Sequence, residues 1–289
     1  MIACMRNRLL RRSAVLLAVL LPLIAPGSAL AEPGDDGDEP EVAPETAAQF
    51  EQRVYGAPNL SPTDGEVVGI AQPVLINFSK SVAAADQGKV QDAVTVTTNP
   101  PQQGVFYWFG DKQLRWRPTQ FWTPGTVVDV QAGNTHTHYS IGDAFVTVAD
   151  DATHTVTVTL NGKVVKTMPV SMGMDKFPTP NGTYYLQERL PTVVMDSSTF
   201  GIPVQDPSGL GYKVNVQYAS RMSWNGIYLH AAPWSVASQG KTDVSHGCLN
   251  VSTDNAKWFM ENSHRGDPVI VKNTKGGILS KGDGLGDWN

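Results

Sequence analysis

Short apolar runs separated by turn residues are the main pattern of the chain after residue 60. Six such runs, rich in β-branched and aromatic side chains, lie between Gly65 and Ile141, with Pro, Gly, Asn and Asp between them. Strands recurring about every 8–12 residues are typical of a β-sandwich. We therefore predict an immunoglobulin-like domain over residues 50–142, with strands at 65–70, 74–78, 94–98, 105–109, 113–117 and 126–130.

Aromatic and basic residues alternate in the fifth of these runs. Leu114 and Trp116 are predicted to face the core, with Arg115 and Arg117 exposed between them. Phe121 and Trp122 follow closely. We interpret the domain as a spacer, with an aromatic glycan-binding face as the alternative.

A second all-β pattern begins near Asp143. It predicts strands at 144–149, 153–160, 163–171, 183–188, 192–195, 226–230 and 268–271, with Asn161-Gly162 as a type I′ hairpin turn. One helix is predicted over residues 255–263, capped by Ser252 to Asp254 and stopped by Gly266. The chain is thus predicted to be mainly β, with a second domain over residues 143–272. The irregular stretch 201–211 is typical of a lid or binding loop, and the tail 273–289 is expected to pack on the domain through Trp288.

The N-terminus has the three parts of a secretory signal. Arg6, Arg8, Arg11 and Arg12 precede an apolar run of about 13 residues, and Ala29-Leu30-Ala31 offers a small-x-small cleavage site. We predict a signal peptide over residues 1–31 and an exported protein of the periplasm or cell wall. An uncleaved segment that tethers the chain to the membrane is the alternative, although a spanning helix needs about 20 apolar residues.

Charge is unevenly distributed after this segment. Without residues 1–31 the chain has 18 basic and 27 acidic residues, and seven of the acids lie between Glu32 and Glu45. With three prolines and no basic residue, the stretch 32–49 is predicted to be a disordered spacer. The remainder is nearly balanced and has no basic patch with interleaved aromatics, so we do not expect a nucleic-acid partner.

Cys248 is the candidate nucleophile, because Cys4 leaves with the signal peptide and no other cysteine remains. A cysteine nucleophile needs a base within hydrogen-bond reach. His230, at the end of a predicted strand, can take the thiol proton, and its other ring nitrogen can donate to a backbone carbonyl. The amides around Gly247 and Cys248 are candidates for an oxyanion hole.

Other interpretations of the histidines were weighed. His230, His246 and Cys248 can be written as three zinc ligands, but His-x-Cys is not a usual zinc spacing and no fourth ligand stands out. No metal and no cofactor are therefore expected. His136, His138, His154 and His264 lack ligand spacing, and Asp243 is expected to be a solvated turn residue.

The block Ser245-His246-Gly247-Cys248-Leu249-Asn250, preceded by Tyr228 to Trp234, closely resembles the signature of the L,D-transpeptidases. The resemblance continues through 195–198, 211–212 and 284–288. The element at 114–118 is similar to the immunoglobulin-like domain of mycobacterial-type members, so the resemblance covers nearly everything after residue 60.

Membership in that family implies a reaction. Cys248 would attack the third residue of a peptidoglycan tetrapeptide stem and expel D-Ala, and the amine of an acceptor stem would resolve the acyl-enzyme into a 3→3 cross-link. His230 would be the general base, oriented by the backbone carbonyl of Ala231, where relatives often have serine. By the same resemblance, the backbone amide of Gly247 would contribute to the oxyanion hole. The expected substrate-binding residues are Met195, Phe200, Tyr212, Trp234, Ser245, His246 and Asn250.

The family also implies partners and leaves alternatives open. Donor and acceptor stems are the expected substrates, β-lactams of the carbapenem type are expected covalent inhibitors, and the chain is expected to be a monomer. An L,D-carboxypeptidase with water as acceptor, or a non-catalytic wall-binding protein, are the alternative functions.

Overall fold

The computed structural model describes residues 43–289, of which Pro44–Asn289 form one compact unit. The predicted signal peptide, Cys4 and most of the predicted spacer lie outside the described residues. Within the described part, the helices are too short or too polar to cross a membrane.

The end of the predicted spacer is helical instead of disordered. Helix α1 (Ala47–Val54) begins after Thr46, whose side chain accepts from the Gln49 amide while the Gln49 side chain accepts from the Thr46 amide. This capping box satisfies two N-terminal amide groups of the helix. Acidic composition predicted disorder up to residue 49, whereas the cap starts the folded part at residue 46.

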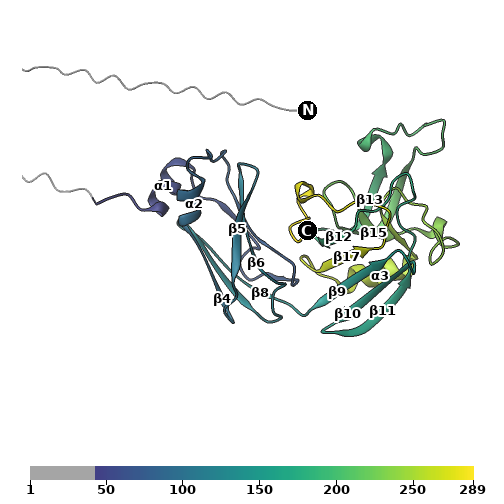
Figure 1. The fold of residues 1–289 in the computed structure, drawn as a ribbon, viewed down its shortest axis with the longest axis horizontal. Helices are drawn as coiled ribbons and strands as arrows, with labels where there is room; N and C mark the ends of the chain where they lie inside the picture. Colours follow the sequence, from purple (N-terminus) through teal and green to yellow (C-terminus); the bar gives the residue numbers. More distant parts are fainter. Residues whose placement is uncertain (1–42) are drawn as a thin grey trace, which may run out of the picture. The chain divides into compact units, whose positions relative to one another are not determined.

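The first domain is a two-sheet sandwich, as predicted (Figure 1). One sheet has the order β1 (Asn59–Ser61), β3 (Val74–Asn77), β6 (Gln113–Pro118), β5 (Gly104–Phe109). The other has the order β2 (Val67–Val68), β8 (Thr135–Ile141), β7 (Val127–Ala132), β4 (Val94–Asn99). Strands β1 and β8 and the short helix α2 (Gln87–Asp92) were not predicted. Polar side chains alternate along β8, with His136 and His138 exposed, so its apolar signal is weak.

Trp116 and Trp122 are buried in the core of this sandwich, where their rings lie 5.3 Å apart. They are therefore not available to a glycan-binding face. The prediction that Arg115 is exposed is wrong: its side chain is buried and paired with Asp287 of the C-terminal tail. Leu114 and Trp116 face the core of the sandwich, as the alternating pattern predicted. The opposite surface of β6 was expected to face water, but the C-terminal tail covers it at Arg115.

The second domain contains two further sheets (Figure 1). One has the order β11 (Lys163–Pro169), β10 (Thr155–Leu160), β9 (Phe145–Asp150), β17 (Pro268–Lys272), β12 (Gly182–Tyr185). The other has the order β13 (Arg189–Asp196), β14 (Lys213–Arg221), β15 (Tyr228–Ala231), β16 (Leu249–Val251). The mainly β prediction is confirmed, although β14 and β16 were not predicted.

Local signals in this domain match the structure closely. Asn161 and Gly162 both have positive φ, 49° and 80°, as a type I′ turn requires. Helix α3 (Thr253–Asn262) is capped by the Ser252 side chain, which accepts from the Asn255 amide. Phe259 and Ala256 of α3 are buried in the core, together with apolar residues of both sheets.

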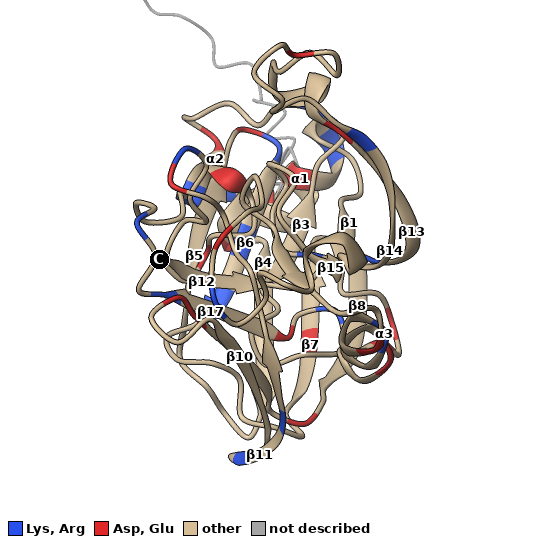
Figure 2. Ribbon diagram, turned by 90° about the vertical axis from the view of Figure 1, so that its right-hand side faces the viewer, with Lys and Arg blue, Asp and Glu red and all other residues tan. Residues whose placement is uncertain are grey.

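The C-terminal tail packs through Trp288, but this side chain contacts the first domain, whereas it was expected to contact the second. Its indole donates to the carbonyl of Ala71 at 2.8 Å and its ring meets Phe121 edge to face at 4.7 Å. Basic and acidic positions are scattered over the described elements, without an extended face of one sign in the view of Figure 2.

Candidate active site

Two neighbouring parallel strands bring the predicted nucleophile and base together. Strands β15 and β16 pair with His230 opposite Asn250 and Leu229 opposite Leu249. Leu229 and Ala231 face the main apolar core, and Tyr228 packs beside Cys248 in a smaller apolar cluster on the other face. Since side chains alternate along a strand, His230 shares the face of Tyr228. The thiol of Cys248, directly before β16, and the imidazole of His230 therefore line the same cavity.

The ring orientation of His230 is set by its own strand. Its Nδ1 lies 2.9 Å from the carbonyl oxygen of Ala231, and the side chain is buried. A proton on Nδ1 donates to that carbonyl, which leaves Nε2 as a proton acceptor. Burial lowers the pKa of His230, so the neutral ring is favoured at neutral pH. The contact uses only the backbone of residue 231, so alanine supplies it as well as serine.

Cys248 is buried and is a free thiol. Its Sγ donates to the carbonyl of Gly226 at 3.6 Å. Burial raises the pKa of the thiol to about 11, and a backbone hydrogen bond from Tyr228 acts in the opposite direction. The resting state is therefore a neutral thiol beside a neutral imidazole, a pair that requires general-base activation.

Ser245 organises the turn before the nucleophile. Its Oγ donates to the carbonyl of Cys248 at 2.7 Å and accepts from the Gly247 amide at 3.0 Å. The hydroxyl predicted to bind substrate is thus used within the turn. The Gly247 amide, predicted for the oxyanion hole, is also engaged there, so it does not point a free N–H toward a substrate. Gly247 has φ 117°, a conformation that favours glycine, and its carbonyl accepts from Thr179 Oγ1 at 3.0 Å.

Two cavities meet at Cys248. The first, of about 350 Å³, contains His230, Trp234, Val244, Ser245 and Asn250 together with part of the 201–211 loop. The second, of about 800 Å³, contains Phe177, Phe200, Arg221, Trp224 and Gly226. Four residues line both: Met195, Tyr212, His246 and Cys248. The nucleophile is therefore accessible from two sides.

An aromatic cluster forms one wall between these cavities. The ring of His246 stacks on Phe177 at 4.8 Å and lies 4.9 Å from Tyr212 and 6.1 Å from Phe200. Burial lowers the pKa of His246 and raises that of Tyr212 to about 12, so both are neutral at neutral pH. His246 therefore packs among aromatic rings in the wall between the two cavities.

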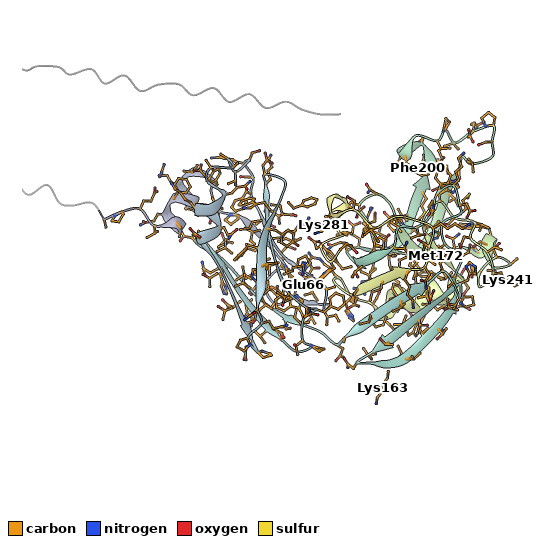
Figure 3. The ribbon with its side chains drawn as sticks, in the orientation of Figure 1. Glu66, Lys163, Met172, Phe200, Lys241 and Lys281 are labelled. Atoms are coloured by element: carbon orange, nitrogen blue, oxygen red, sulfur yellow. The ribbon has the colours of Figure 1, made fainter. Side chains whose placement is uncertain are left out.

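The irregular loop after β13 carries part of this cluster. The 3-10 turn η1 (Ser197–Phe200) ends at Gly201, and Phe200 lies at the foot of the loop, 46% exposed (Figure 3). Ser197, before the loop, is hydrogen-bonded to Tyr212, after it. The Oγ of Ser197 accepts from the Tyr212 amide at 2.9 Å, and the Ser197 amide donates to the Tyr212 carbonyl at 2.9 Å. These hydrogen bonds close the loop 201–211 at its base.

The remaining predicted residues also lie at the site. Asn250 is buried, its Oδ1 has no hydrogen-bond partner, and it lines the first cavity. Trp234, in the 3-10 turn η2 (Pro233–Ser235), is 57% exposed with its ring 6.1 Å from His230. Met195 packs in the apolar cluster of Tyr228 and Cys248. All seven predicted substrate-side residues therefore line one of the two cavities.

Three residues of the second cavity were missed. Phe177 lies far from the motif in sequence, and no local signal marks it. Trp224, 51% exposed, and Arg221 stand just before the predicted strand at 226–230, and the guanidinium of Arg221 lies 5.2 Å from the Trp224 ring and 4.7 Å from the Tyr228 ring. Arg221 and Trp224 stand a few residues before His230 in the sequence, and this proximity is the feature from which their place at the site could have been predicted.

The zinc alternative is not supported by this geometry. Among residues 43–289, one group of three side chains brings metal-ligand atoms within 4.8 Å of one another, and it consists of Asp151, His154 and Asp243. His230, His246 and Cys248 do not form such a group.

Comparison with known proteins agrees with this architecture. Residues 35–138 match the model of a bacterial Ig domain, and residues 144–271 match the L,D-transpeptidase catalytic domain. The chain is 48% identical to L,D-transpeptidase 2 of Mycobacterium tuberculosis, over 80% of this chain and 59% of that protein. It thus spans less than two thirds of that relative. It is 41% identical to L,D-transpeptidase 1 of the same species, over 76% of this chain and 86% of that protein.

Solved structures give the same result. The structure of L,D-transpeptidase LdtMt1 in complex with imipenem matches with a TM-score of 0.70 at 41% identity, over 74% of this chain and 97% of that chain. L,D-transpeptidase 3 of Mycobacterium tuberculosis, with a faropenem-derived adduct, matches with a TM-score of 0.68 at 36% identity, over 74% and 97%. The predicted resemblance is confirmed: this chain belongs to the L,D-transpeptidase family, cysteine-dependent acyltransferases, with a bacterial Ig domain before the catalytic domain.

Proposed function

We propose that the protein forms 3→3 cross-links between peptidoglycan stem peptides, with Cys248 as nucleophile and His230 as general base. The observation that carries this proposal is the position of Cys248 at the junction of two cavities. A transpeptidase must admit a donor peptide and then an acceptor to one sulfur atom, and two separate approaches to that atom serve this purpose. A hydrolase needs only one.

The proposed steps use the groups already described. As Sγ of Cys248 attacks the carbonyl of the third stem residue, Nε2 of His230 takes the thiol proton. The C–N bond to D-Ala then breaks, and His230 gives the proton to the leaving amine. The side-chain amine of the acceptor attacks the thioester, passes a proton to His230, and Cys248 leaves as a thiolate that recovers the proton. The Ala231 carbonyl holds the imidazole in one orientation throughout.

One of the two amides expected in the oxyanion hole, that of Gly247, donates to Ser245. We therefore propose that the phenol of Tyr212, which lines both cavities, supports the developing charge. Burial raises the pKa of Tyr212 to about 12, so the hydroxyl keeps its proton and can donate it to an oxyanion.

Location and inhibition follow from the family. L,D-transpeptidases act on cell-wall peptidoglycan outside the cytoplasm. We propose that residues 1–31 direct export and are cleaved after Ala31, and that the mature chain acts as a monomer. Because the relative LdtMt1 was solved with imipenem, we propose that carbapenems acylate Cys248.

The test is incubation of the purified protein with a disaccharide-tetrapeptide, followed by mass spectrometry. Cross-linked dimer with loss of D-Ala is expected from the wild-type protein, and none from Cys248→Ala. Tripeptide alone would identify an L,D-carboxypeptidase instead. Unchanged substrate from a folded wild-type protein would favour a non-catalytic wall-binding protein.

The two cavities offer a matched pair of variants. Trp234 and Trp224 are both about half exposed and lie in the first and second cavity respectively. If each cavity binds one substrate, Trp234→Ala and Trp224→Ala will have different effects. The variant in the donor cavity will slow acylation, which is measured as D-Ala release. The variant in the acceptor cavity will lower only the ratio of cross-linked dimer to tripeptide. Equal effects of both variants on both steps would contradict the assignment of two substrates to two cavities.

A further inference from the structure

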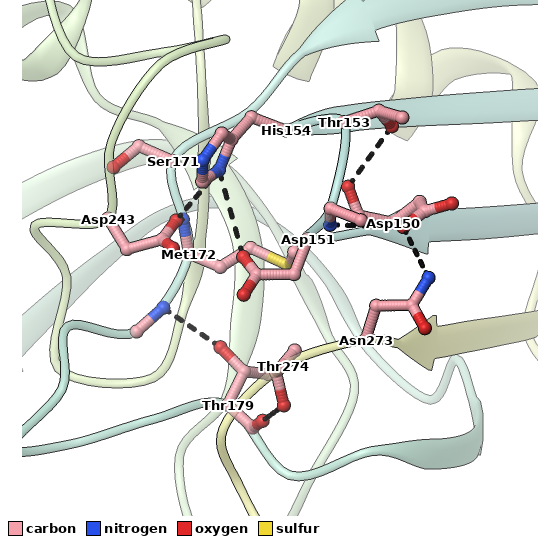
Figure 4. A network of polar contacts seen from close by, with 12 residues as sticks. Asp150, Asp151, Thr153, His154, Ser171, Met172, Thr179, Asp243, Asn273 and Thr274 are labelled. Atoms are coloured by element: carbon pink, nitrogen blue, oxygen red, sulfur yellow. Dashed lines mark hydrogen bonds and ion pairs between the residues drawn. The ribbon is translucent and has the colours of Figure 1, made fainter.

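A group of three polar side chains outside the active site has the composition of a metal centre. Asp151 and His154 lie in the turn between β9 and β10, and Asp243 lies in the loop that leads to Cys248 (Figure 4). None of the three lines either cavity at Cys248. The expectation that Asp243 is a solvated turn residue is not met, since its side chain is only 18% exposed, and that of His154 is 24% exposed.

The ligand atoms converge on one point. Nδ1 of His154 lies 3.4 Å from Oδ1 of Asp243 and 3.7 Å from Oδ1 of Asp151. Figure 4 shows the imidazole directed between the two carboxylates. In a tetrahedral zinc site with bonds of about 2.0–2.1 Å, ligand atoms are roughly 3.3–3.4 Å apart. The observed spacing is therefore close to that of three vertices of such a site.

Two of these three atoms have no hydrogen-bond partner. Nδ1 of His154 and Oδ1 of Asp151 are buried and have no hydrogen bond. Buried polar atoms in proteins are normally paired, so an unpaired donor and acceptor facing one another need an explanation. A cation that accepts a lone pair from each would satisfy both at once.

The charge of the group also needs compensation. The carboxylates of Asp151 and Asp243 both face the imidazole of His154. Lys275 and Lys272 form ion pairs with other carboxylates, Lys275 with Asp175 at 2.6 Å and Lys272 with Asp150 at 3.0 Å. No basic side chain of the described residues forms an ion pair with Asp151 or Asp243 other than His154.

The backbone holds the three residues in place before any ion binds. His154 has φ 48°, in the left-handed region that disfavours most side chains. Its carbonyl accepts from the Val170 amide at 2.9 Å, and Oδ1 of Asp243 accepts from the Met172 amide at 2.6 Å. The group is thus built on hydrogen-bonded backbone from three segments.

We propose that Asp151, His154 and Asp243 bind a divalent zinc ion, with water as the fourth ligand. Two carboxylate oxygens and one imidazole nitrogen form a donor set that suits zinc, whereas calcium requires six to eight oxygen ligands. The ion would join the β9–β10 turn to the loop before Cys248. That loop is bonded in turn to the segment of Met172, since the Ser245 amide donates to the Met172 carbonyl at 3.0 Å.

The test is zinc titration by calorimetry after chelator treatment, in a Cys248→Ala background so that the nucleophile cannot bind the metal. One zinc ion per chain is expected. Asp151→Asn and His154→Gln should each weaken binding at least tenfold. Asp243→Asn keeps an acceptor for the Met172 amide and should weaken binding without loss of the fold, which circular dichroism checks.

Matched controls come from the first domain. His136 lies 3.0 Å from Asp129 on an exposed surface, so His136→Gln removes a comparable histidine–carboxylate pair without touching the proposed site. It should leave the zinc affinity unchanged, and calcium should not compete. Equal loss in His136→Gln, or no zinc bound by the parent protein, would overturn the proposal.

Two further measurements are independent of the variants. Anomalous scattering at the zinc edge should place one peak between the three side chains, and a peak elsewhere would refute the site. Zinc should also raise the melting temperature of the parent and not of His154→Gln, since a ligand that binds only the folded state stabilises it.

Discussion

Arg115 on strand β6 donates to both carboxylate oxygens of Asp287 in the C-terminal tail, at 2.7 and 2.8 Å, and both side chains are almost completely buried. The same guanidinium nitrogen donates to the carbonyl of Gly284, and the hydroxyl of Tyr107 donates to Asp287. Residues about 170 positions apart thus form one buried polar group that joins the Ig domain to the end of the chain.

Removal of one member of this pair should be costly. Asp287→Ala leaves a buried guanidinium without its counter-ion, which destabilises proteins by about 3–5 kcal/mol. Urea unfolding should show this loss, and the double variant Arg115→Leu/Asp287→Leu should recover part of it. Arg53→Ala removes an ion pair with Glu45 that lies on the surface, and it should leave the midpoint unchanged. Equal midpoints for Asp287→Ala and Arg53→Ala would refute the importance of the buried pair.

The thiol of Cys248 should react slowly with iodoacetamide at neutral pH. Burial raises its pKa to about 11, and only the thiolate is nucleophilic. The alkylation rate should rise about tenfold per pH unit between pH 7 and 10, because the thiolate fraction does. A rate that is already constant from pH 7 upward would indicate a preformed thiolate–imidazolium pair, contrary to the neutral pair described above.

Ser245→Ala should lower kcat more than it raises KM. The variant removes the hydroxyl that bridges the Gly247 amide and the Cys248 carbonyl. Two lost hydrogen bonds of about 1 kcal/mol each correspond to roughly a tenfold to thirtyfold effect. Steady-state release of D-Ala measures it. Ser208→Ala, in the exposed part of the lid, is the control, and a rise in KM at constant kcat for Ser245→Ala would instead support direct substrate binding.

Glu51 should make stability decrease as pH rises. Its carboxylate is buried beside Gly133 without a hydrogen-bond partner, and burial raises its pKa from 4.5 to about 7. Since the folded state holds this proton more tightly than the unfolded state, the free energy of unfolding falls between pH 4.5 and about pH 7. The full shift corresponds to at most about 3 kcal/mol.

Glu51→Gln should therefore raise the melting temperature at pH 8 and have little effect at pH 5. Glu45→Gln, on the surface nearby, is the control, and its melting temperature should follow the wild type at both pH values. A Glu51→Gln variant that is equally displaced at pH 5 and pH 8 would show that the carboxylate does not titrate as described.

Local patterns were sufficient for much of this fold and for the proposal of Cys248 and His230 as the reactive residues. The Asn161-Gly162 turn, the Ser252 cap and the alternating runs are properties of neighbouring residues, so they are visible in the sequence. Strand β8 was missed because its exposed face carries His136 and His138, and β14 because it is long and largely polar on one side. In the active site, Cys248 and His230 were identified from the motif, and Phe177, Arg221 and Trp224 were not.

The sequence by itself determined the two-domain β architecture and the residues proposed as nucleophile and base, since these depend on short-range periodicity and on a local motif. Only the tertiary structure decided that Arg115 is buried, that the Gly247 amide is engaged by Ser245, and that Asp151, His154 and Asp243 meet. The physical reason is the same in each case. Burial and hydrogen bonding depend on which distant segment covers a residue, and that is set by packing and not by the neighbours along the chain.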